Sequence, residues 1–121
     1  MKEIIFDSSF LMAVAEHPTT WREDMTESFG SYAPLLLDCV RRELVNIEVT
    51  KKGKASMARV ALELSKDFAM VPTAQMAADD EIVSSALQRG AAVATLDAKL
   101  TGTLRALHVQ VIGLRSGRVF S

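Results

Sequence analysis

Short apolar segments without polar alternation recur along the chain, and they predict strands that are covered on both faces. The clearest are Glu3–Phe6, Ala33–Leu37, Ala91–Thr95 and Val109–Ile112, and a weaker fifth lies at Ala69–Val71. Strands of this kind are typical of parallel sheets, because helices cover both faces of such a sheet. The pattern therefore predicts a central parallel sheet of four to five strands.

Apolar residues spaced three and four apart predict helices between these strands. The predicted helices are one through Val40, Leu44 and Ile47, one over Ala55–Phe68, one over Ala77–Arg89 with Gly90 as its C-terminal cap, and one through Leu100, Leu104 and Leu107. Asp38 and Asp97 precede two of them, and we interpret Asp38 as an N-cap. The segment His17–Gly30 is expected to form a helical hairpin or cap, with a helix that begins at Pro18 or Thr20.

Alternation of strand and helix predicts an α/β fold of three layers, with helices on both faces of the sheet. The chain has 121 residues, of which 49% are hydrophobic. A chain of this length and composition can bury a self-supporting core. Without an internal repeat, a low-complexity stretch or a linker, residues 1–121 are expected to form a single domain.

Composition and charge narrow the function classes. Lys and Arg number 14 against 15 Asp and Glu, and only 6% of residues are aromatic. Nucleic-acid binding by bulk positive charge or by an exposed aromatic platform is therefore not expected, and any such contact must come from local patches. The single cysteine, Cys39, excludes a disulfide framework and a multi-cysteine metal site. No apolar run approaches the roughly 18 residues of a membrane span. The N-terminus does not resemble a signal peptide, so a cytoplasmic protein without membrane attachment is expected.

Acidic residues follow the predicted strands or lie at the beginnings of helices. Asp7 and Asp97 come directly after apolar strands, Glu43 lies near the core-facing side of a helix, and Asp79 and Asp80 begin another helix. Ligands of parallel sheets bind outside the carboxyl ends of the strands. Carboxylates that converge there repel one another unless a cation joins them, and oxygen ligands alone suit Mg²⁺ or Mn²⁺. Such a metal site supports phosphodiester cleavage by an activated water.

Each acid also has a simpler structural interpretation. Asp7 and Asp97 could be N-caps, and Asp79 and Asp80 could be first-turn acids that the helix dipole favours. Glu43 could be an ordinary surface acid beside Arg41 and Arg42. The recurrence of carboxylates at strand ends within one architecture favours the metal site over these interpretations.

Four segments along essentially the whole chain resemble the motifs of PIN-domain nucleases. They are Ile4–Leu11 with Asp7, Val40–Leu44 with Glu43, Ala78–Ala86 with Asp79, and Val93–Asp97. The resemblance implies a PIN-like fold and an acidic quartet of Asp7, Glu43, Asp79 and Asp97 that binds Mg²⁺ or Mn²⁺ and is catalytic, with Asp80 as an alternative ligand. It also implies that Ser9 and Thr95 orient a carboxylate or a water, although the family's usual residue at the Ser9 position is Asn.

The family implies a metal-dependent endoribonuclease, and its members have two kinds of biology. One is ribosomal-RNA processing in archaea and eukaryotes, which implies a ribosome-assembly partner. The other is that of the VapC-type toxins, which an antitoxin silences. The segments Val93–Asp97 and Val111–Arg115 are more similar to the archaeal processing group. A catalytically silent module that binds RNA or protein is the alternative from another class, and the intact quartet speaks against it. A receiver domain is discounted because Asp7 has no acidic neighbour.

Basic residues near the motifs are candidates for RNA contact. We predict that Lys51, Lys52, Lys54, Lys99 and Arg105 contact phosphates near the acidic pocket, and Arg115 and Arg118 lie in the tail. Phosphate contacts position a strand without reading its sequence. Small domains of this family often pair, so a homodimer is also expected.

Overall fold

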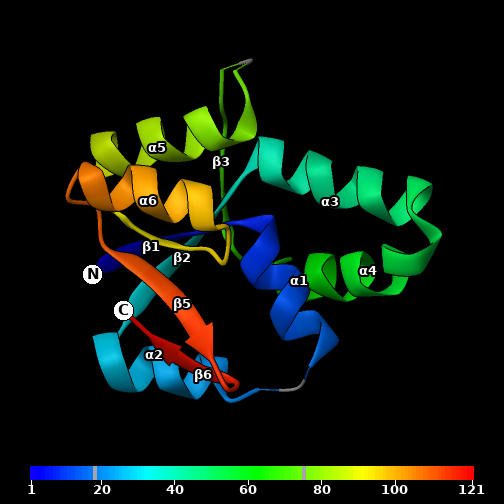
Figure 1. The fold of residues 1–121 in the computed structure, drawn as a ribbon, viewed down its shortest axis with the longest axis horizontal. Coiled ribbons are helices and arrows are strands. Elements are labelled where there is room, and N and C mark those ends of the chain that lie inside the picture. The colour runs from blue at the N-terminus through cyan, green and yellow to red at the C-terminus, as the bar shows by residue number, and fades with distance from the viewer. Residues whose placement is uncertain (18, 75) are drawn as a thin grey trace.

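Strands and helices alternate along the chain, as the sequence pattern predicts. A computed structural model of the protein describes residues 1–17, 19–74 and 76–121, and Figure 1 shows its course. The strands are β1 (Lys2–Phe6), β2 (Tyr32–Leu37), β3 (Ala69–Val71), β4 (Ala92–Ala94), β5 (Val111–Arg115) and β6 (Arg118–Phe120). The helices are α1 (Ser8–Glu16), α2 (Trp21–Phe29), α3 (Asp38–Thr50), α4 (Ala55–Leu64), α5 (Ala78–Arg89) and α6 (Ala98–Ala106), and a short 3₁₀ turn (Lys52–Lys54) joins α3 to α4.

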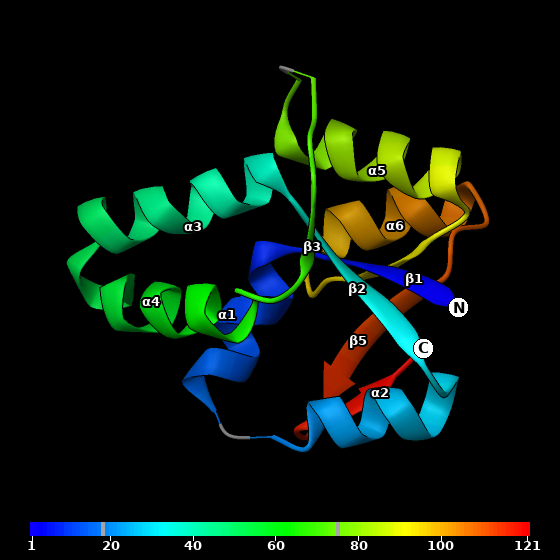
Figure 2. The same ribbon diagram turned by 180° about the vertical axis from the view of Figure 1, so that it is seen from behind.

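The sheet has the strand order β3-β2-β1-β4-β5-β6. Its first five strands in this order are parallel, and β6 runs antiparallel to β5. The central strand β1 pairs Ile5 with Leu35 of β2 on one side and with Val93 of β4 on the other. Figure 2 shows the opposite edge strand, β3, beside β2. The predicted parallel α/β sheet is therefore confirmed.

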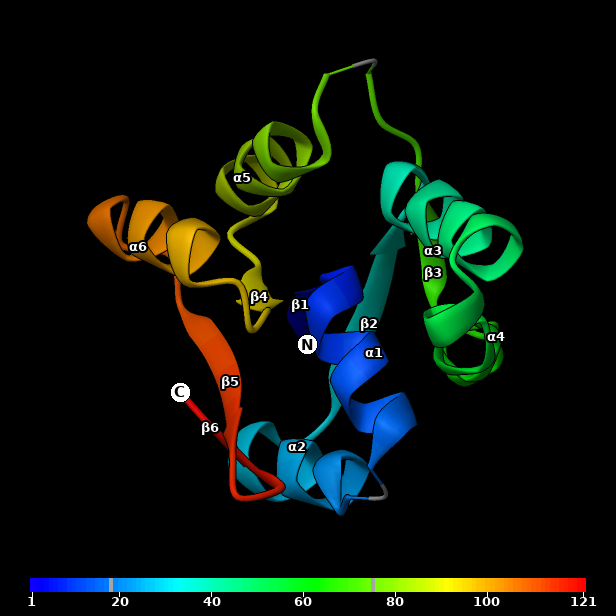
Figure 3. The ribbon, with the colours of Figure 1, turned by 45° about the vertical axis from the view of Figure 1, so that its right-hand side comes forward.

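Helices cover both faces of this sheet, which makes three layers. Figure 3 shows α5 and α6 on one side, while α1, α3 and α4 lie on the other. Helix α1 packs on α4, α4 packs on α3, and α2 lies against β2 and β6. On the opposite side, α5 lies over β1 and β4, and α6 lies over β5. The order of strands and the division of helices are those of a doubly wound sheet.

An aromatic cluster lies under the beginning of α1. The ring of Phe6 packs against Phe10, Trp21 and Phe68 at centroid separations of 5.5, 5.6 and 4.9 Å. Phe6 and Phe10 are fully buried. Aromatic pairs in such geometry contribute about 0.5–1.5 kcal/mol beyond the apolar area that they bury. The cluster therefore fixes the end of β1, where the chain leaves the sheet.

The strand predictions differ from the structure mainly at the C-terminus. The sheet has six strands in the described residues instead of four to five, because the short strand β6 gives no apolar run. Strand β5 was expected over Val109–Ile112, but it begins at Val111 and continues to Arg115. The reason is the hairpin, since pairing with β6 extends the hydrogen-bonded ladder beyond the apolar run.

The helix predictions hold, with three corrections. Helix α4 ends at Leu64 rather than Phe68, and Ser65 follows it with its hydroxyl donating to the Ala61 carbonyl at 2.9 Å. Phe68 is buried because its loop packs on Phe6, not because it continues the helix. Leu107, which the periodicity places on the core face of its helix, is 43% exposed. Gly90 has a φ of +64° at the C-cap of α5, where the sequence predicts it.

The segment before β2 contains one helix, α2, with Thr20 at its N-cap position. The alternative start at Pro18 lies outside the described residues. Trp21 and Met25 are buried on the side of α2 that the spacing predicts. No helix in the described ranges is long and apolar enough to span a membrane.

Asp24 of α2 joins this helix to the C-terminal hairpin. Its side chain is 5% exposed, and its Oδ2 accepts from the Arg118 guanidinium at 2.9 Å and from the Val119 backbone N–H at 3.1 Å. The Arg118 hydrogen bond, followed by that of Val119, lowers the pKa of the Asp24 carboxyl below its ordinary value of 3.8. The ionised form therefore holds β6 against α2.

We expect Asp24→Asn to lower the stability of the fold at neutral pH. A lowered pKa means that the ionised carboxylate stabilises the folded state above the unfolded pKa, and this contribution is lost as the pH falls through the folded value. The difference in urea midpoint between wild type and variant should therefore begin to narrow below about pH 4 and close once the pH lies below the folded pKa. The matched control is Glu23→Gln, an exposed neighbour on α2. An equal loss in both variants, or a difference that persists at pH 2, would contradict the anchoring role.

Candidate active site

Asp7 lies where the chain changes direction in the sheet. It follows β1, whose connection leads toward β2, while the neighbouring strand β4 leads away to β5. This is a topological switch point, where the ends of adjacent strands diverge and leave a crevice for ligands. The Asp7 backbone N–H donates to the Ala94 carbonyl at 2.9 Å, which fixes the residue on β4. The fold therefore places this acid at the position where parallel sheets bind ligands.

Two hydroxyls orient the Asp7 side chain, which is 7% exposed. Ser9 Oγ and Thr95 Oγ1 both lie 2.7 Å from Asp7 Oδ2 and donate to it. Ser9 Oγ in turn accepts from the Leu96 N–H at 2.9 Å, and Thr95 Oγ1 accepts from the Asp97 N–H at 3.1 Å. The network ties the end of β1 to the loop after β4. Both hydroxyls donate to Oδ2, and neither donates to Oδ1, the other oxygen of the Asp7 carboxylate.

Glu43 reaches this site from α3, the helix that follows β2. Its side chain is exposed, and the Ser8 hydroxyl donates to its Oε1. Ser8 is the residue directly after Asp7, so this bond holds Glu43 beside the end of β1. Sequence reasoning did not identify Ser8, and the only signal for it is a hydroxyl next to the first acid of the motif.

Asp79 lies in the first turn of α5, and its pKa depends on the charges of the other three acids. Asp79 is exposed, but nearby protein atoms take part of the water from its carboxyl group. This loss of water, and after it the negative charges of Asp7, Asp97 and Glu43, raise the pKa of the Asp79 carboxyl above its ordinary value of 3.8, and the positive charge of Lys99 partly opposes this. Asp7, Asp97 and Glu43 therefore each lie within electrostatic range of Asp79. Asp80, the next residue of α5, has an exposed side chain.

Asp97 is a helix N-cap, and its charge also acts on Asp79. Its Oδ1 accepts from the Leu100 backbone N–H at 2.8 Å, so it is the N-cap of α6. Its side chain is exposed, and its charge reaches Asp79. A capping carboxylate keeps a second oxygen that can face a ligand, so the cap does not exclude a functional role.

The donor set fits a hard divalent cation. The four acids supply oxygen ligands only, which suits Mg²⁺ or Mn²⁺. A cation at this place would neutralise the negative charges that raise the pKa of Asp79. Within residues 1–17, 19–74 and 76–121, no three His, Cys, Asp or Glu side chains are already grouped at metal-ligating distances. Glu43, Asp79 and Asp97 are exposed, and exposed side chains change rotamer within nanoseconds.

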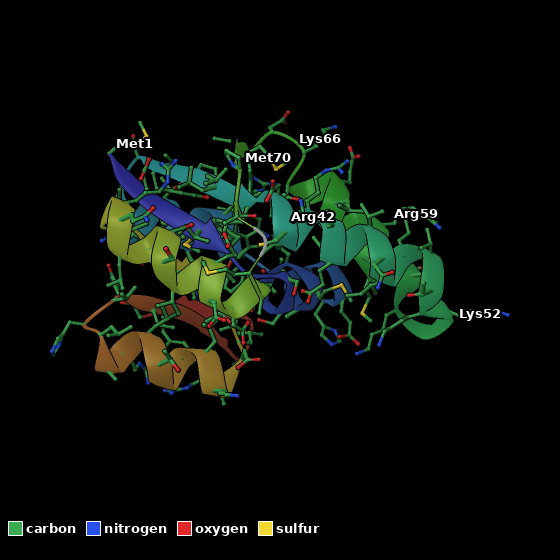
Figure 4. All side chains as sticks on the ribbon, turned by 90° about the horizontal axis from the view of Figure 1, so that it is seen from above. Met1, Arg42, Lys52, Arg59, Lys66 and Met70 are labelled. Atoms are coloured by element: carbon green, nitrogen blue, oxygen red, sulfur yellow. The ribbon has the colours of Figure 1, made fainter. Side chains whose placement is uncertain are left out.

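The predicted phosphate contacts fall into two groups. Lys99 lies within electrostatic range of Asp79, and Arg105 lines a pocket that includes Thr95. Lys51, Lys52 and Lys54 instead lie at the turn between α3 and α4. Figure 4 shows Lys52 at the far end of the helix pair α3 and α4, beyond Arg42 and Arg59. Along α3, Lys51 is about 12 Å from Glu43 at 1.5 Å per residue.

Asp38 is not the N-cap that the sequence predicts. Leu37 occupies that position, and Asp38 is the first residue of α3. Its carboxylate accepts from the Thr73 hydroxyl and pairs with Arg42 at 3.4 Å. The Thr73 bond is the main reason that the pKa of the Asp38 carboxyl lies below its ordinary value of 3.8. The physical reason is the sheet, since β3 pairs with β2 and brings the loop after β3 beside the start of α3.

Comparison with known proteins identifies the family. The family described as "PIN like domain" matches residues 4–117. The chain therefore belongs to the PIN-like domain family, a family of nucleases that typically use divalent metal ions. This confirms the resemblance that the four sequence motifs indicate. No curated protein matches the chain significantly.

Solved structures of similar fold agree with this assignment. The PIN domain endonuclease Utp24 superposes with a TM-score of 0.79 at 24% identity, covering 97% of this chain and 88% of that one. A protein from Pyrobaculum aerophilum gives 0.63 at 16% identity, with 91% and 83% covered. A PilT N-terminus domain protein from the archaeon Sulfolobus solfataricus gives 0.57 at 11% identity, with 92% and 86% covered. At these identities the likeness establishes the fold.

Proposed function

We propose that this protein is a divalent-metal-dependent endoribonuclease that cleaves phosphodiester bonds, with RNA processing as its role. The observation that carries the proposal is the place of Asp7 at the topological switch point, where Ser9 and Thr95 hold its side chain and where the charges of Asp97 and Glu43 act on nearby Asp79. The four acids come from separate segments of the chain, and a bound cation would offset the repulsion that Asp7, Asp97 and Glu43 exert on Asp79. The similarity to a PIN domain endonuclease supports the reaction class.

In this proposal the chain's own residues bind and orient. Asp7, Glu43, Asp79 and Asp97 hold Mg²⁺ or Mn²⁺, which when bound supplies an activated water and neutralises charge on the phosphate. Ser9 and Thr95 keep Asp7 in one rotamer through their bonds to Oδ2, so that Oδ1 faces the crevice. Lys99 lies near Asp79 and is placed to contact a phosphate that enters the site.

The test is thermal unfolding with Mg²⁺ or Mn²⁺, read beside cleavage of single-stranded RNA. A ligand that binds only the folded state stabilises it by about 2.7 kcal/mol at 100 times its Kd. We expect the metal-induced rise in Tm to disappear in Asp79→Asn, which in metal-free buffer should be at least as stable as wild type because it removes repulsion. A wild type that neither gains stability from millimolar metal nor cleaves RNA would refute the proposal.

Asp80→Asn is the matched control for Asp79→Asn. The two acids are adjacent and exposed on α5, so both substitutions remove the same charge from the same helix terminus. We expect Asp80→Asn to retain the metal response and the cleavage. The reverse result would assign the ligand role to Asp80.

A further inference from the structure

A second pocket opens beside the acidic site, between α6 and the C-terminal hairpin. It has a volume of about 290 Å³. Its walls come from the end of β4, from α6, from β5 and from β6, at Thr95, Leu96, Thr101, Arg105, Val111, Gly113, Leu114, Arg115 and Phe120. Figure 3 shows α6 beside the start of β5, with β6 further along that strand. Small-molecule sites usually measure about 300–1,000 Å³, so this pocket has room for one small ligand unit.

The pocket shares one residue, Thr95, with the candidate active site. The same residue lines the pocket and donates from Oγ1 to Asp7 Oδ2 at 2.7 Å. Leu96, the next lining residue, is joined to Ser9 by its backbone N–H. A strand with a phosphate at the acids would therefore lead into this pocket with its neighbouring nucleotide.

The charge of the pocket is opposite to that of the acids. Two arginines line it, Arg105 and Arg115, and no acidic residue does so among the residues that the structure describes. Within the described parts of the chain, neither arginine forms an ion pair with a carboxylate. An unneutralised guanidinium suits the planar, two-oxygen recognition of a phosphate.

Arg115 is also held over an aromatic ring. Its guanidinium carbon lies 4.6 Å from the centroid of the Phe120 ring. Gly113 faces Phe120 across the β5–β6 ladder, and a Cβ there would lie 3.1 Å from the ring. The glycine thus lets the ring lie close against β5, and the ring in turn supports Arg115. Bases of single-stranded RNA stack on aromatic rings and on arginine planes of this kind.

We propose that this pocket binds the nucleotide adjacent to the scissile phosphate of a single-stranded RNA. Arg105 binds its phosphate, and Arg115, supported by Phe120, stacks on its base. The inference deepens the proposed endoribonuclease function and rests on it for the position of the scissile phosphate. The observations favour RNA over an acidic protein segment, because the stacked platform offers a face to a base that a carboxylate side chain does not use.

The test is binding of a fluorescein-labelled, mixed-sequence single-stranded RNA, measured by anisotropy at several salt concentrations. All proteins carry Asp7→Asn, which is expected to prevent cleavage. We expect Arg105→Ala and Arg115→Ala each to raise the Kd about 5-fold or more. Arg105→Ala should also reduce the salt slope by about 0.7, the value for one phosphate contact on a single strand. Arg115→Lys keeps the charge but not the plane, so it should weaken binding without changing that slope.

The matched control is Arg89→Ala. Arg89 lies at the end of α5 and pairs at 3.2 Å with Glu3, near the start of the central strand β1, so it is at the amino end of the strands and not at the carboxyl end where the acids lie. Equal binding by Arg89→Ala and the pocket variants would overturn the inference and leave the proposed function untouched. No RNA binding by any protein would overturn it as well. A labelled hexaglutamate peptide is the probe for a protein partner. If the wild-type pocket binds this peptide, and the pocket variants lose peptide binding but keep RNA binding, the pocket is assigned to a protein partner instead.

The two proposals fail separately. Cleavage by the otherwise wild-type chain with Mg²⁺ or Mn²⁺ reports on the acidic site. Anisotropy reports on the pocket in a protein that does not cleave. Loss of RNA binding in the pocket variants, together with no cleavage by wild type, would leave an RNA-binding pocket beside a silent site.

Discussion

Asp7→Asn is expected to abolish metal-dependent RNA cleavage while the protein remains folded. Asp7 is the acid that the structure fixes most firmly, through two hydroxyls on Oδ2 and a backbone bond to Ala94. Loss of a residue that only orients a metal ligand typically costs 10–100-fold, so loss of the proposed ligand itself should exceed about 100-fold. The measurement is the cleavage rate of single-stranded RNA at saturating Mg²⁺ or Mn²⁺.

The fold should tolerate this change because asparagine has the same shape. The Ser9 and Thr95 hydroxyls can accept from an amide as well as donate to a carboxylate. Without metal, relief of the repulsion at Asp79 offsets the loss of these charge-assisted bonds, so the unfolding free energy should lie within about 1 kcal/mol of wild type.

Two comparisons make the result on Asp7 specific. Asp67→Asn removes an equal charge from an exposed acid in the loop between α4 and β3, and it should cleave at the wild-type rate. Thr95→Ser keeps the hydroxyl that donates to Asp7, whereas Thr95→Val removes it. We therefore expect activity to persist in the serine variant and to fall in the valine variant. Undiminished cleavage by Asp7→Asn would place the chemistry elsewhere.

Phe6→Ala should be the most destabilising single substitution discussed for this protein. Phe6 is fully buried and packs on three other rings, of which Phe68 at 4.9 Å is the nearest. Truncation of a buried phenylalanine costs about 3–5 kcal/mol through lost transfer free energy and the cavity that remains. Total stabilities of domains are about 5–15 kcal/mol, so the variant would lose a large part of its margin. A drop in Tm of about 10–20 °C is expected at this chain length.

The measurement is guanidinium-induced unfolding of Phe6→Ala beside Phe6→Leu. Leucine keeps much of the volume but makes no ring contacts, so we expect it to lose less than half as much free energy. A loss below about 1 kcal/mol in Phe6→Ala would show that Phe10, Trp21 and Phe68 close the cavity by themselves. Because Phe6 precedes Asp7, the leucine variant also tests whether the aromatic cluster positions the candidate site, through its cleavage rate at a temperature where it is fully folded.

Much of the architecture could be predicted from local pattern. The buried strands at Ile4–Phe6 and Leu35–Leu37 are apolar on both faces, because helices cover both sides of the sheet. The strand β6 could not be predicted in this way. Val119 and Phe120 are half-buried, and their strand forms because β5 offers an edge and Asp24 holds Arg118.

The candidate acids could be recognised from local sequence, but their hydrogen-bond partners could not. Asp7, Glu43, Asp79 and Asp97 stand out in the sequence because each lies at a strand end or near the beginning of a helix. Asp38 shares that pattern, yet its carboxylate binds Thr73 instead. Thr73 is 35 residues away, so no local rule could have found it.

The sequence by itself determined the order of strands and helices along the chain, the family and the identities of the candidate acids. These depend on apolar periodicity and on short motifs, both of which are local along the chain. Only the tertiary structure decided which oxygen of Asp7 the hydroxyls hold, that Ser8 reaches Glu43, and that Arg105 and Arg115 share a pocket with Thr95. The physical reason is that each of these contacts joins residues from different strands and helices, and their meeting depends on how the sheet orders those elements.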